Sequence, residues 1–525
     1  MMEDDLPGAM DDRFLKSPYA RANVQGVVVH YLRARLLSGL AGVLFVVLLA
    51  RHMAVEAYAQ FATIAGIAAT IGLLSSIGLE KAVTCYLPAG RIQQTSRVLA
   101  RFIWRVLGLR IALLIAATAL LAGAWRLAGN LALADGLLLL VAALVVATNV
   151  FQFLALILQC LVQQQTLSRV LIVQWGGRLV LLAALLFFTP GISFRDAIIT
   201  MAIPEVLGSG VLLIALRRHL RHLIAIDMSL IVPKPHWPPW REVRKLMQHN
   251  YGYAWLIAAP QANALIVLVA LLLSVPQVAA YGFFTSIVER LRSYLPLQFM
   301  LNLAEPVLMA SYVRDRDFAA LCQRGNLLYQ LNVVVLMLLL AWTSVVAPTL
   351  ARLLTGEKYA AFAWILPLLL AQIALGSCNT ILQVVVNCVG RSEILTRSGS
   401  VALAAMAASF LALMLSERTM ILLLATPLVF EMANSATAIH LLRRAGFAYR
   451  WHGLFHLKVA AAGAAAWFVT SQCVAGMTSA LAQVIVAGVL CASVFAVSCM
   501  LLRIVAPENV LAVKRLLRSR HQATT

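Results

Sequence analysis

The sequence predicts an all-α polytopic membrane protein with about 14 transmembrane helices. Of its 525 residues, 62% are apolar and only 12% are charged, and the mean hydropathy is +0.88. A soluble protein keeps about a quarter of its residues charged, so the main solvent of this chain is lipid. Apolar stretches of about 20 residues, long enough to cross a bilayer, recur along the whole chain. Lysine and arginine gather in alternate connecting segments, as they do in cytoplasmic loops.

Each apolar stretch is predicted to be a helix, because backbone in lipid has to satisfy its hydrogen bonds within its own segment. The polar stretches between them are too short to bury a core, so no soluble domain is expected. The predicted spans cover residues 36–53, 57–79, 106–124, 136–160, 170–189, 197–216, 252–274, 279–308, 326–347, 361–386, 398–415, 420–442, 459–476 and 482–502.

The orientation follows from the lysines and arginines. If the N-terminus is inside, 32 of the 42 fall in predicted cytoplasmic segments and 6 in predicted periplasmic loops. This positive-inside distribution accounts for the formal net charge of +21 without nucleic acid as a partner. We therefore expect a multi-pass protein of the bacterial inner (cytoplasmic) membrane with both termini in the cytoplasm.

Cysteine-accessibility labelling from the periplasm tests this orientation, in a background whose eight native cysteines are replaced. A cysteine in segment 217–250 is expected to stay unlabelled and one near Glu417 to react, because lysine-rich and arginine-rich segments stay inside. Labelling of segment 217–250 from outside would reverse the orientation.

An internal repeat divides most of the chain into two six-helix halves. Three pairs of segments align in order at offsets between 223 and 228 residues. Because six is an even number, the halves are expected to be parallel repeats about a pseudo-two-fold axis along the membrane normal. The aligned pairs are 48–64 with 271–287 (7 identities in 17 positions), 159–169 with 387–397, and the region of Glu205 with that of Glu431.

The repeat and the charge pattern predict the organisation of the chain. The linker between the two halves (219–250) mixes proline, tryptophan and basic residues, so it is expected to lie on the cytoplasmic face of the membrane. The C-terminal tail (506–525) resembles a basic amphipathic helix and is expected to lie on anionic phospholipid. The predicted parts are a polar N-terminal segment (1–26), an N-lobe with helices 1–6 (27–218), a cytoplasmic linker (219–250), a C-lobe with helices 7–12 (251–444), helices 13–14 (445–505) and a basic cytoplasmic tail (506–525).

Ionisable residues inside the spans are the strongest functional candidates, because a charge in the membrane interior is costly. Arg290 and Arg178 lie too deep to reach the headgroups easily, so both are expected to face a shared water-filled lumen. The aligned pair Glu205 and Glu431 is expected either to carry protons, since burial favours the neutral carboxyl, or to make a helix-packing hydrogen bond.

Structural roles stay open for several of these charges. Arg33 and Arg35, at the mouth of the first span, can extend to the headgroups. Glu289 and Arg292 are i, i+3 neighbours on one helical face and can pair with each other.

The sequence contains no pattern that predicts a cofactor, a metal site or a catalytic residue. The cysteines lack metal-ligand spacing and fit the behaviour of small apolar residues, and the pair His452 and His456 lacks a third ligand. No GxxxxGK[ST] phosphate loop occurs, which excludes an ATP-driven exporter within this chain. We therefore expect a transporter and not an enzyme.

Two segments carry a resemblance to a known family. The run LLARHMAVEAYAQFATIAGIAATIGLLSSIGLEKAV at 48–83 has an arginine closing one helix, an aromatic–small pair opening the next, and Gly-Leu before a cytoplasmic loop. The run YGFFTSIVERLRSYLPLQFMLNLAEPVLMASYVRD at 281–315 places Glu289 beside Arg290 in the eighth span. On these patterns the chain resembles the MOP exporter superfamily, specifically its Wzx-type polysaccharide or O-antigen flippases, which are related to MurJ-type lipid II flippases. Ala59 replaces the family's usual glycine.

The resemblance implies translocation of a polyprenyl-pyrophosphate-linked oligosaccharide across the inner membrane for polysaccharide export, including exopolysaccharide. Two lobes would open alternately to each side around a cationic cavity, where arginine forks bind the phosphates while the apolar tail stays in lipid. The implied substrate-binding residues are Arg290, Arg178, Arg292, Arg110, Arg33 and Arg35, and the candidate ion-coupling residues are Glu205, Glu431 and Glu289.

Two alternatives remain open at this point. A cation- or drug-coupled antiporter of the same superfamily would need acidic lumen residues, which the aligned glutamates could supply and the deep arginines oppose. A membrane glycan polymerase or ligase normally needs a large outward loop, and the longest predicted one, 348–360, has only 13 residues. The expected partners are the lipid-linked glycan and anionic phospholipids, with polysaccharide polymerase and export proteins as further candidates and no nucleic acid.

Overall fold

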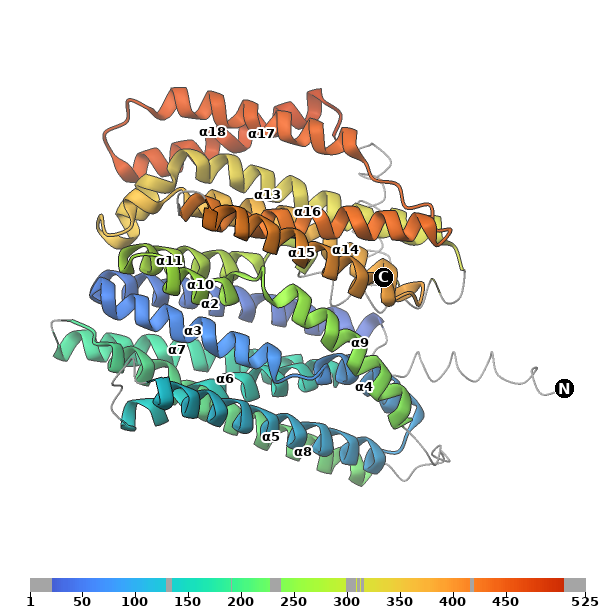
Figure 1. Cartoon of the computed structure of the whole chain (residues 1–525). Helices are drawn as coiled ribbons and strands as arrows, with labels where there is room; N and C mark the ends of the chain where they lie inside the picture. The colour runs from blue at the N-terminus through green and yellow to red at the C-terminus, as the bar shows by residue number, and fades with distance from the viewer. Residues whose placement is uncertain are drawn as a thin grey trace. The chain divides into compact units, whose positions relative to one another are not determined.

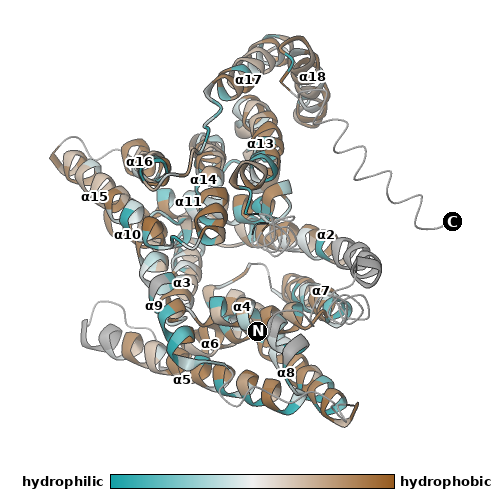
Figure 2. Ribbon diagram, turned by 90° about the vertical axis from the view of Figure 1, so that its right-hand side faces the viewer, coloured by the Kyte–Doolittle hydropathy of each residue, from teal (hydrophilic) through white to brown (hydrophobic). Residues whose placement is uncertain are grey.

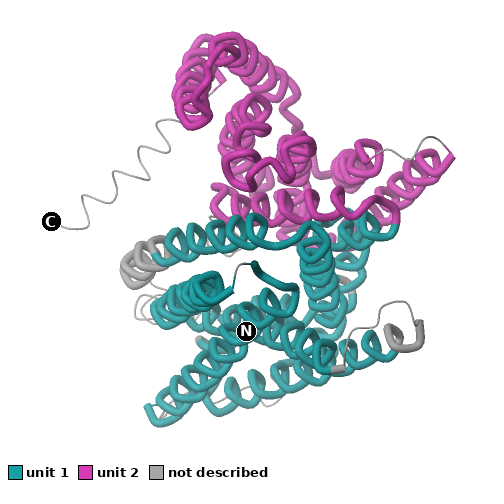
Figure 3. Tube along the Cα trace, turned by 90° about the vertical axis from the view of Figure 1, so that its left-hand side faces the viewer, with its two compact units in different colours: residues 1–271 teal, residues 272–525 magenta. Residues whose placement is uncertain are grey.

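The computed structural model describes residues 21–128, 135–189, 191–226, 238–298, 308, 312, 316–415 and 420–504. The chain divides into two compact units, residues 1–271 and 272–525 (Figure 3). Every named element in the described ranges is a helix, and an isolated parallel bridge joins Met53 to Ile192.

The first unit is built mostly from long helices, and it includes a 15-residue helix, α4, that sequence patterning did not predict (Figure 1). Figure 2 shows that helices such as α5 and α8 combine hydrophobic stretches with hydrophilic turns. The helices are α2 (Arg21–His52), α3 (Val55–Leu74), α4 (Leu79–Gln93), α5 (Ser96–Ala128), α6 (Asp135–Cys160), α7 (Gln164–Phe188), α8 (Phe194–Ile226), α9 (Trp240–Ala258) and α10 (Ala262–Leu272).

The second unit contains α11 and a group of helices around the long helix α13. α13 packs against α14, α17 and α18, and α15 packs against α16. The elements are α11 (Val275–Arg292), α13 (Phe318–Thr355), the 3-10 turn η1 (Ala360–Phe362), α14 (Ile365–Cys388), α15 (Glu393–Leu415), α16 (Met420–Arg444), α17 (Gly453–Val474) and α18 (Ala480–Leu501).

The membrane-spanning character of the chain is confirmed, whereas the count of 14 is not. Among the described residues, 12 helices are long and apolar enough to cross a membrane, or 13 if α9 and α10, bent by 41°, form one span. The predicted eighth span, 279–308, corresponds to α11 for its first half, and most of its remainder lies outside the described residues. α11 is only 18 residues long and carries three charged side chains at its end, which explains its weaker apolar signal.

The unpredicted helix α4 is held by an apolar stripe. Leu79, Val83 and Leu87 recur every four residues, lie on one helical face and are almost fully buried. They join a core cluster with residues of α5, α6, α7 and α8. Gly78 precedes α4 with a φ of +75° and its α-carbon faces the backbone of Met247, so a residue without a side chain fits there.

A second glycine brings α3 close to α10. A Cβ atom on Gly66 would lie 2.1 Å from Cγ2 of Ile266 and 2.6 Å from the carbonyl oxygen of Asn263. The backbone carbonyl cannot move aside as a flexible side chain could, so this contact depends on glycine.

We expect Gly66→Ala to lower the free energy of unfolding by about 1–3 kcal/mol, because an extra methyl group in a filled interface forces backbone shifts. The matched control is Gly108→Ala on α5, where a Cβ atom would meet nothing within 4 Å. Alanine there should leave stability unchanged or raise it by up to about 1 kcal/mol through its better helix propensity. Unfolding midpoints of both variants in the same detergent check the prediction, and equal midpoints would contradict it.

Polar contacts tie α18 to α13, and α17 packs against both of these helices. Thr349 donates to Oε1 of Gln483 at 2.8 Å, and the indole of Trp342 donates to the carbonyl oxygen of Val484 at 3.4 Å. α17 and α18 are therefore an integral part of the second unit.

Candidate functional site

A buried ion pair joins α7 and α8 in the first unit. Nη2 of Arg178 contacts Oε1 of Glu205, and Nε2 of Gln174 donates to Oε2 of the same carboxylate at 2.6 Å. The side chains of Arg178 and Glu205 are only 2% and 7% exposed. The guanidinium also lies 4.0 Å from the ring centroid of Trp175, in a cation–π contact.

This ion pair brings together two residues that the sequence assigns to different roles. Arg178 was expected to bind substrate in an open lumen, and Glu205 to couple ions. In the structure each balances the charge of the other inside the first unit, and Arg178 faces protein and not an open space. The partner residue Gln174 was not predicted, although its i, i+4 spacing from Arg178 on one helix could have suggested it.

A second buried arginine, Arg110, holds the end of α3. It donates to the carbonyl oxygen of Gly72 at 2.7 Å and to the hydroxyl of Ser75 at 3.1 Å. Its Nη2 lies 3.2 Å from Oε1 of Glu80, and Arg110 is only 3% exposed while Glu80 is 43% exposed. Burial raises the pKa of the Glu80 carboxyl, and the charge of Arg110 opposes that shift. Sequence reasoning selected Arg110 and missed Glu80, which begins the unpredicted helix α4.

In the second unit the carboxylate of Glu431 has an amide partner where Glu205 has an arginine. Asn379 on α14 donates through Nδ2 to the carboxylate of Glu431 and, at 3.0 Å, to its backbone carbonyl. Ser435 donates to Oδ1 of Asn379 at 2.8 Å. A Cβ on Gly376 would lie 3.2 Å from the carboxyl group, so the small residue makes room for it. Glu205 and Glu431 occupy aligned sequence positions, yet their partners come from different helices.

The charged end of α11 is less deeply buried than the other candidate site residues in the spans. A capping box of Ser274 and Gln277 starts the helix, and residues 278–285 are buried. Glu289, Arg290 and Arg292 follow at the other end, and all three are half-buried. Arg292 lies 3.4 Å from Oε1 of Glu289, with exposures of 39% and 34%, so the predicted i, i+3 pair is present.

Arg33 and Arg35 lie near the start of the chain, in α2. Arg35 lies in α2 and is half-buried, whereas the side chain of Arg33 lies outside those that the structure describes. Both remain sequence-based candidates.

Comparison with known proteins identifies the fold. No protein-family model matches the chain, and no curated protein matches it in sequence. Among solved structures, the lipid II flippase MurJ in its inward closed conformation has a TM-score of 0.63 and 12% identity, covering 90% of this chain and 99% of that one. An inward-facing multidrug resistance MATE family transporter of the MOP superfamily has a TM-score of 0.52 and 12% identity over 80% of this chain and 98% of its own.

A third structure, a MOP superfamily transporter from Pyrococcus furiosus, has a TM-score of 0.51 and 16% identity, with 80% and 94% of the two chains covered. The chain therefore has the polytopic all-α fold of MurJ and of MOP superfamily transporters.

Proposed function

We propose that this chain is a flippase of the MOP superfamily, of the Wzx type, that moves a polyprenyl-pyrophosphate-linked oligosaccharide across the bacterial inner membrane by alternating access. The observation that carries the proposal is the shared fold with a lipid II flippase over 90% of the chain, combined with arginines on α11 that protein atoms leave partly uncovered.

The charge at the end of α11 favours an anionic cargo. Two arginines and one glutamate lie at that end of the helix, where Arg292 is paired with Glu289 and also interacts electrostatically with Glu431 of α16, so Arg290 is the cation in excess on α11. A guanidinium is charged at every physiological pH and matches two phosphate oxygens with its planar fork. In this proposal Arg290 and Arg292 bind the pyrophosphate while the polyprenyl chain stays in lipid.

Arg110 and Arg178 have a different role in this proposal. Both are almost fully buried and already bound to protein groups, so breaking them away to bind substrate would leave Glu80 or Glu205 without its cation. The cost is largest for Glu205, because a carboxylate that is only 7% exposed cannot regain its hydration when it loses its partner. For Arg110 the cost lies in its own burial and in its lost hydrogen bonds to the end of α3. We therefore assign these two arginines to holding the first unit together, and the phosphate contacts to α11.

A cation-coupled antiporter is the second candidate. Glu431 favours it, because its carboxyl group accepts a hydrogen bond from the neutral amide of Asn379 and can gain or lose a proton without breaking a direct salt bridge. A multidrug resistance transporter has the same fold, which supports this second candidate.

Reconstitution into proteoliposomes separates the two functions. We expect a fluorescent polyprenyl-pyrophosphate oligosaccharide to become accessible to an impermeant quencher on the opposite leaflet only when the protein is present. An oligosaccharide on the same polyprenyl tail with a neutral linkage should not move, because the arginines then have no phosphate to bind. Transport of a cationic dye with no movement of the pyrophosphate cargo would reject the flippase and support the antiporter.

Proton coupling is tested in the same vesicles by Glu431→Gln. Glutamine keeps an oxygen for Asn379 and removes titration, so the component of transport that depends on a pH gradient should disappear while transport without a gradient continues. Glu393→Gln is the matched control, because Glu393 lies at the start of α15 and forms an exposed ion pair with Arg391 at 3.4 Å. Gradient-driven transport that survives in Glu431→Gln and in Glu205→Gln would rule out both aligned glutamates and leave Glu289 or no ion.

A further inference from the structure

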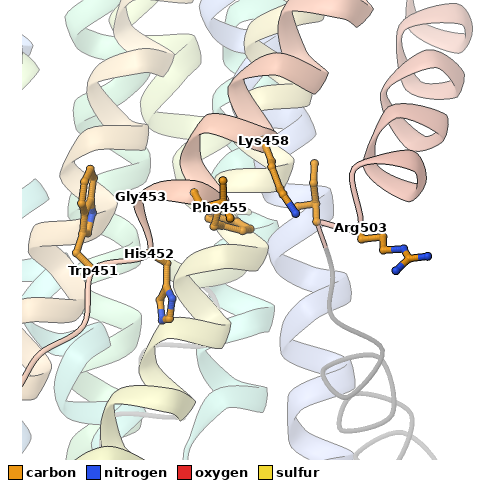
Figure 4. Close-up of a pocket in the computed structure, with 8 residues that line it drawn as sticks. Trp451, His452, Gly453, Phe455, Lys458 and Arg503 are labelled. Atoms are coloured by element: carbon orange, nitrogen blue, oxygen red, sulfur yellow. The ribbon is translucent and has the colours of Figure 1, made fainter.

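An open pocket lies where α17 begins and α18 ends, away from α11. Its volume is about 420 Å³. Figure 4 shows Lys458 reaching from α17 toward the residues after α18, with Arg503 at that end and Trp451, His452 and Phe455 along the start of α17. The lining residues are Trp451, His452, Gly453, Leu454, Phe455, Lys458, Arg503 and Ile504.

The charge in this pocket is positive. Lys458 on α17 and Arg503 just after α18 bring two cations, and the residues that line the pocket include no acidic side chain. No side chain caps the first turn of α17, so the positive end of the helix dipole also faces this region. An anion beside Lys458 would meet its ammonium group and the backbone N–H groups at the start of α17, while the Arg503 side chain extends outward from the same pocket (Figure 4).

The pocket wall is fixed by packing and hydrogen bonds. His456 stacks on Trp451, with ring centroids 5.3 Å apart and an interplanar angle of 21°. The ring of His456 also lies 5.5 Å from that of Tyr329 on α13. The hydroxyl of Tyr449, in the segment leading to α17, donates to Oδ1 of Asn326 at 2.8 Å. The segment between α16 and α17 is therefore anchored on α13 and holds its shape without a ligand.

The surroundings of the pocket place it at a membrane surface. α17 and α18 are both apolar and long enough to span a bilayer, and the pocket lies at the end of each. Leu454 and Leu457 are 67% and 68% exposed, and Trp451 is 56% exposed. Exposed leucines beside an exposed tryptophan fit the boundary between acyl chains and headgroups, where indole rings concentrate.

We propose that this pocket binds the phosphate of an anionic phospholipid headgroup, with the acyl chains lying along the exposed leucines of α17. A lipid fits better than a soluble phosphate because the cations stand directly beside exposed apolar side chains. The site is separate from the cargo-binding arginines of α11 and does not depend on the proposed transport function.

Native mass spectrometry of the delipidated full-length protein tests the proposal. The protein is titrated with phosphatidylglycerol and, in parallel, with phosphatidylcholine of the same acyl chains. We expect one phosphatidylglycerol to bind more tightly than the rest, and Lys458→Gln with Arg503→Gln to weaken it about 30-fold, since each cation near a membrane surface contributes about a fivefold factor. Phosphatidylcholine should show no such preferred site.

The matched control removes two exposed arginines elsewhere, Arg217→Gln with Arg218→Gln at the end of α8. This control should keep the preferred phosphatidylglycerol site. If both double variants lose the same phosphatidylglycerol affinity, the effect comes from net charge and not from this pocket, and the proposal is overturned.

Two further measurements separate the remaining outcomes. Millimolar inorganic phosphate should leave lipid binding unchanged, and complete displacement by phosphate would overturn the lipid assignment in favour of a free-anion site. Phosphatidylglycerol should raise the thermal unfolding midpoint of the wild-type protein and not that of the Lys458/Arg503 variant. Because all four substituted residues are partly or fully exposed, both variants should fold, and matching unfolding midpoints without lipid check this.

Discussion

Arg178→Ala is expected to lower the free energy of unfolding by about 3–5 kcal/mol, the largest stability loss that the structure predicts for a single substitution in the first unit. The substitution leaves Glu205 as a charge that is only 7% exposed and has lost its cation. Removing one member of a buried pair costs far more than the pair contributes, because the remaining charge cannot regain its hydration. Unfolding in mixed micelles with increasing SDS measures the loss.

The double variant Arg178→Gln with Glu205→Gln separates charge from packing. It removes both charges and keeps side chains that can hydrogen-bond to each other and to Gln174, so most of the lost stability should return. If the double variant is as unstable as Arg178→Ala, packing against Trp175 carries the effect and the ion pair does not. Arg169→Ala, at an exposed position of the same helix, should leave stability within about 0.5 kcal/mol of the wild type.

Arg290→Ala is expected to reduce transport of the pyrophosphate cargo about 30-fold or more while the protein stays folded and inserted. The reason is that truncating one member of a desolvated charge pair, here with phosphate, costs about 2–5 kcal/mol. Arg290→Lys keeps the charge and loses the planar fork, so its transport rate should fall between those of the wild type and of Arg290→Ala. The measurement is the initial rate of cargo movement in proteoliposomes.

The control for this loss is Arg397→Ala, which removes an exposed arginine from α15 in the same unit. It should transport at the wild-type rate. Arg290→Ala must also match the wild type in its thermal unfolding midpoint, since Arg290 has neighbours within the protein as well. A stable Arg290→Ala protein with normal transport would assign Arg290 to structure or to lipid contact.

The spans could be predicted from sequence because their signal is local. An apolar stretch of about 20 residues is sufficient evidence for a helix when the solvent is lipid. α4 was missed because Lys81 and Arg91 mark its segment as a connecting loop, and this charge signal hid the apolar stripe formed by Leu79, Val83 and Leu87.

In the candidate site, contacts within one helix could be predicted from sequence, whereas contacts between helices could not. Glu289 and Arg292 could be paired from sequence, because i, i+3 neighbours share a face of one helix. The partner of Glu431 could not, because Asn379 lies on another helix and the contact depends on how α14 and α16 are rotated against each other. The alignment of Glu205 with Glu431 suggested equal environments, and only the packing shows that one carboxylate faces a guanidinium and the other an amide.

The ion pair between α7 and α8 also constrains how the chain enters the membrane during synthesis. α7 emerges first and carries Arg178 near its middle, which disfavours insertion of that helix by about 2.5–3.5 kcal/mol when the arginine lies at its centre. Glu205 follows on α8 after a short connection, so the cation meets its counter-charge only when both helices have been made. The two segments are therefore expected to leave the translocon together as a helical hairpin, and a ribosome stalled between them should hold α7 at the lateral gate.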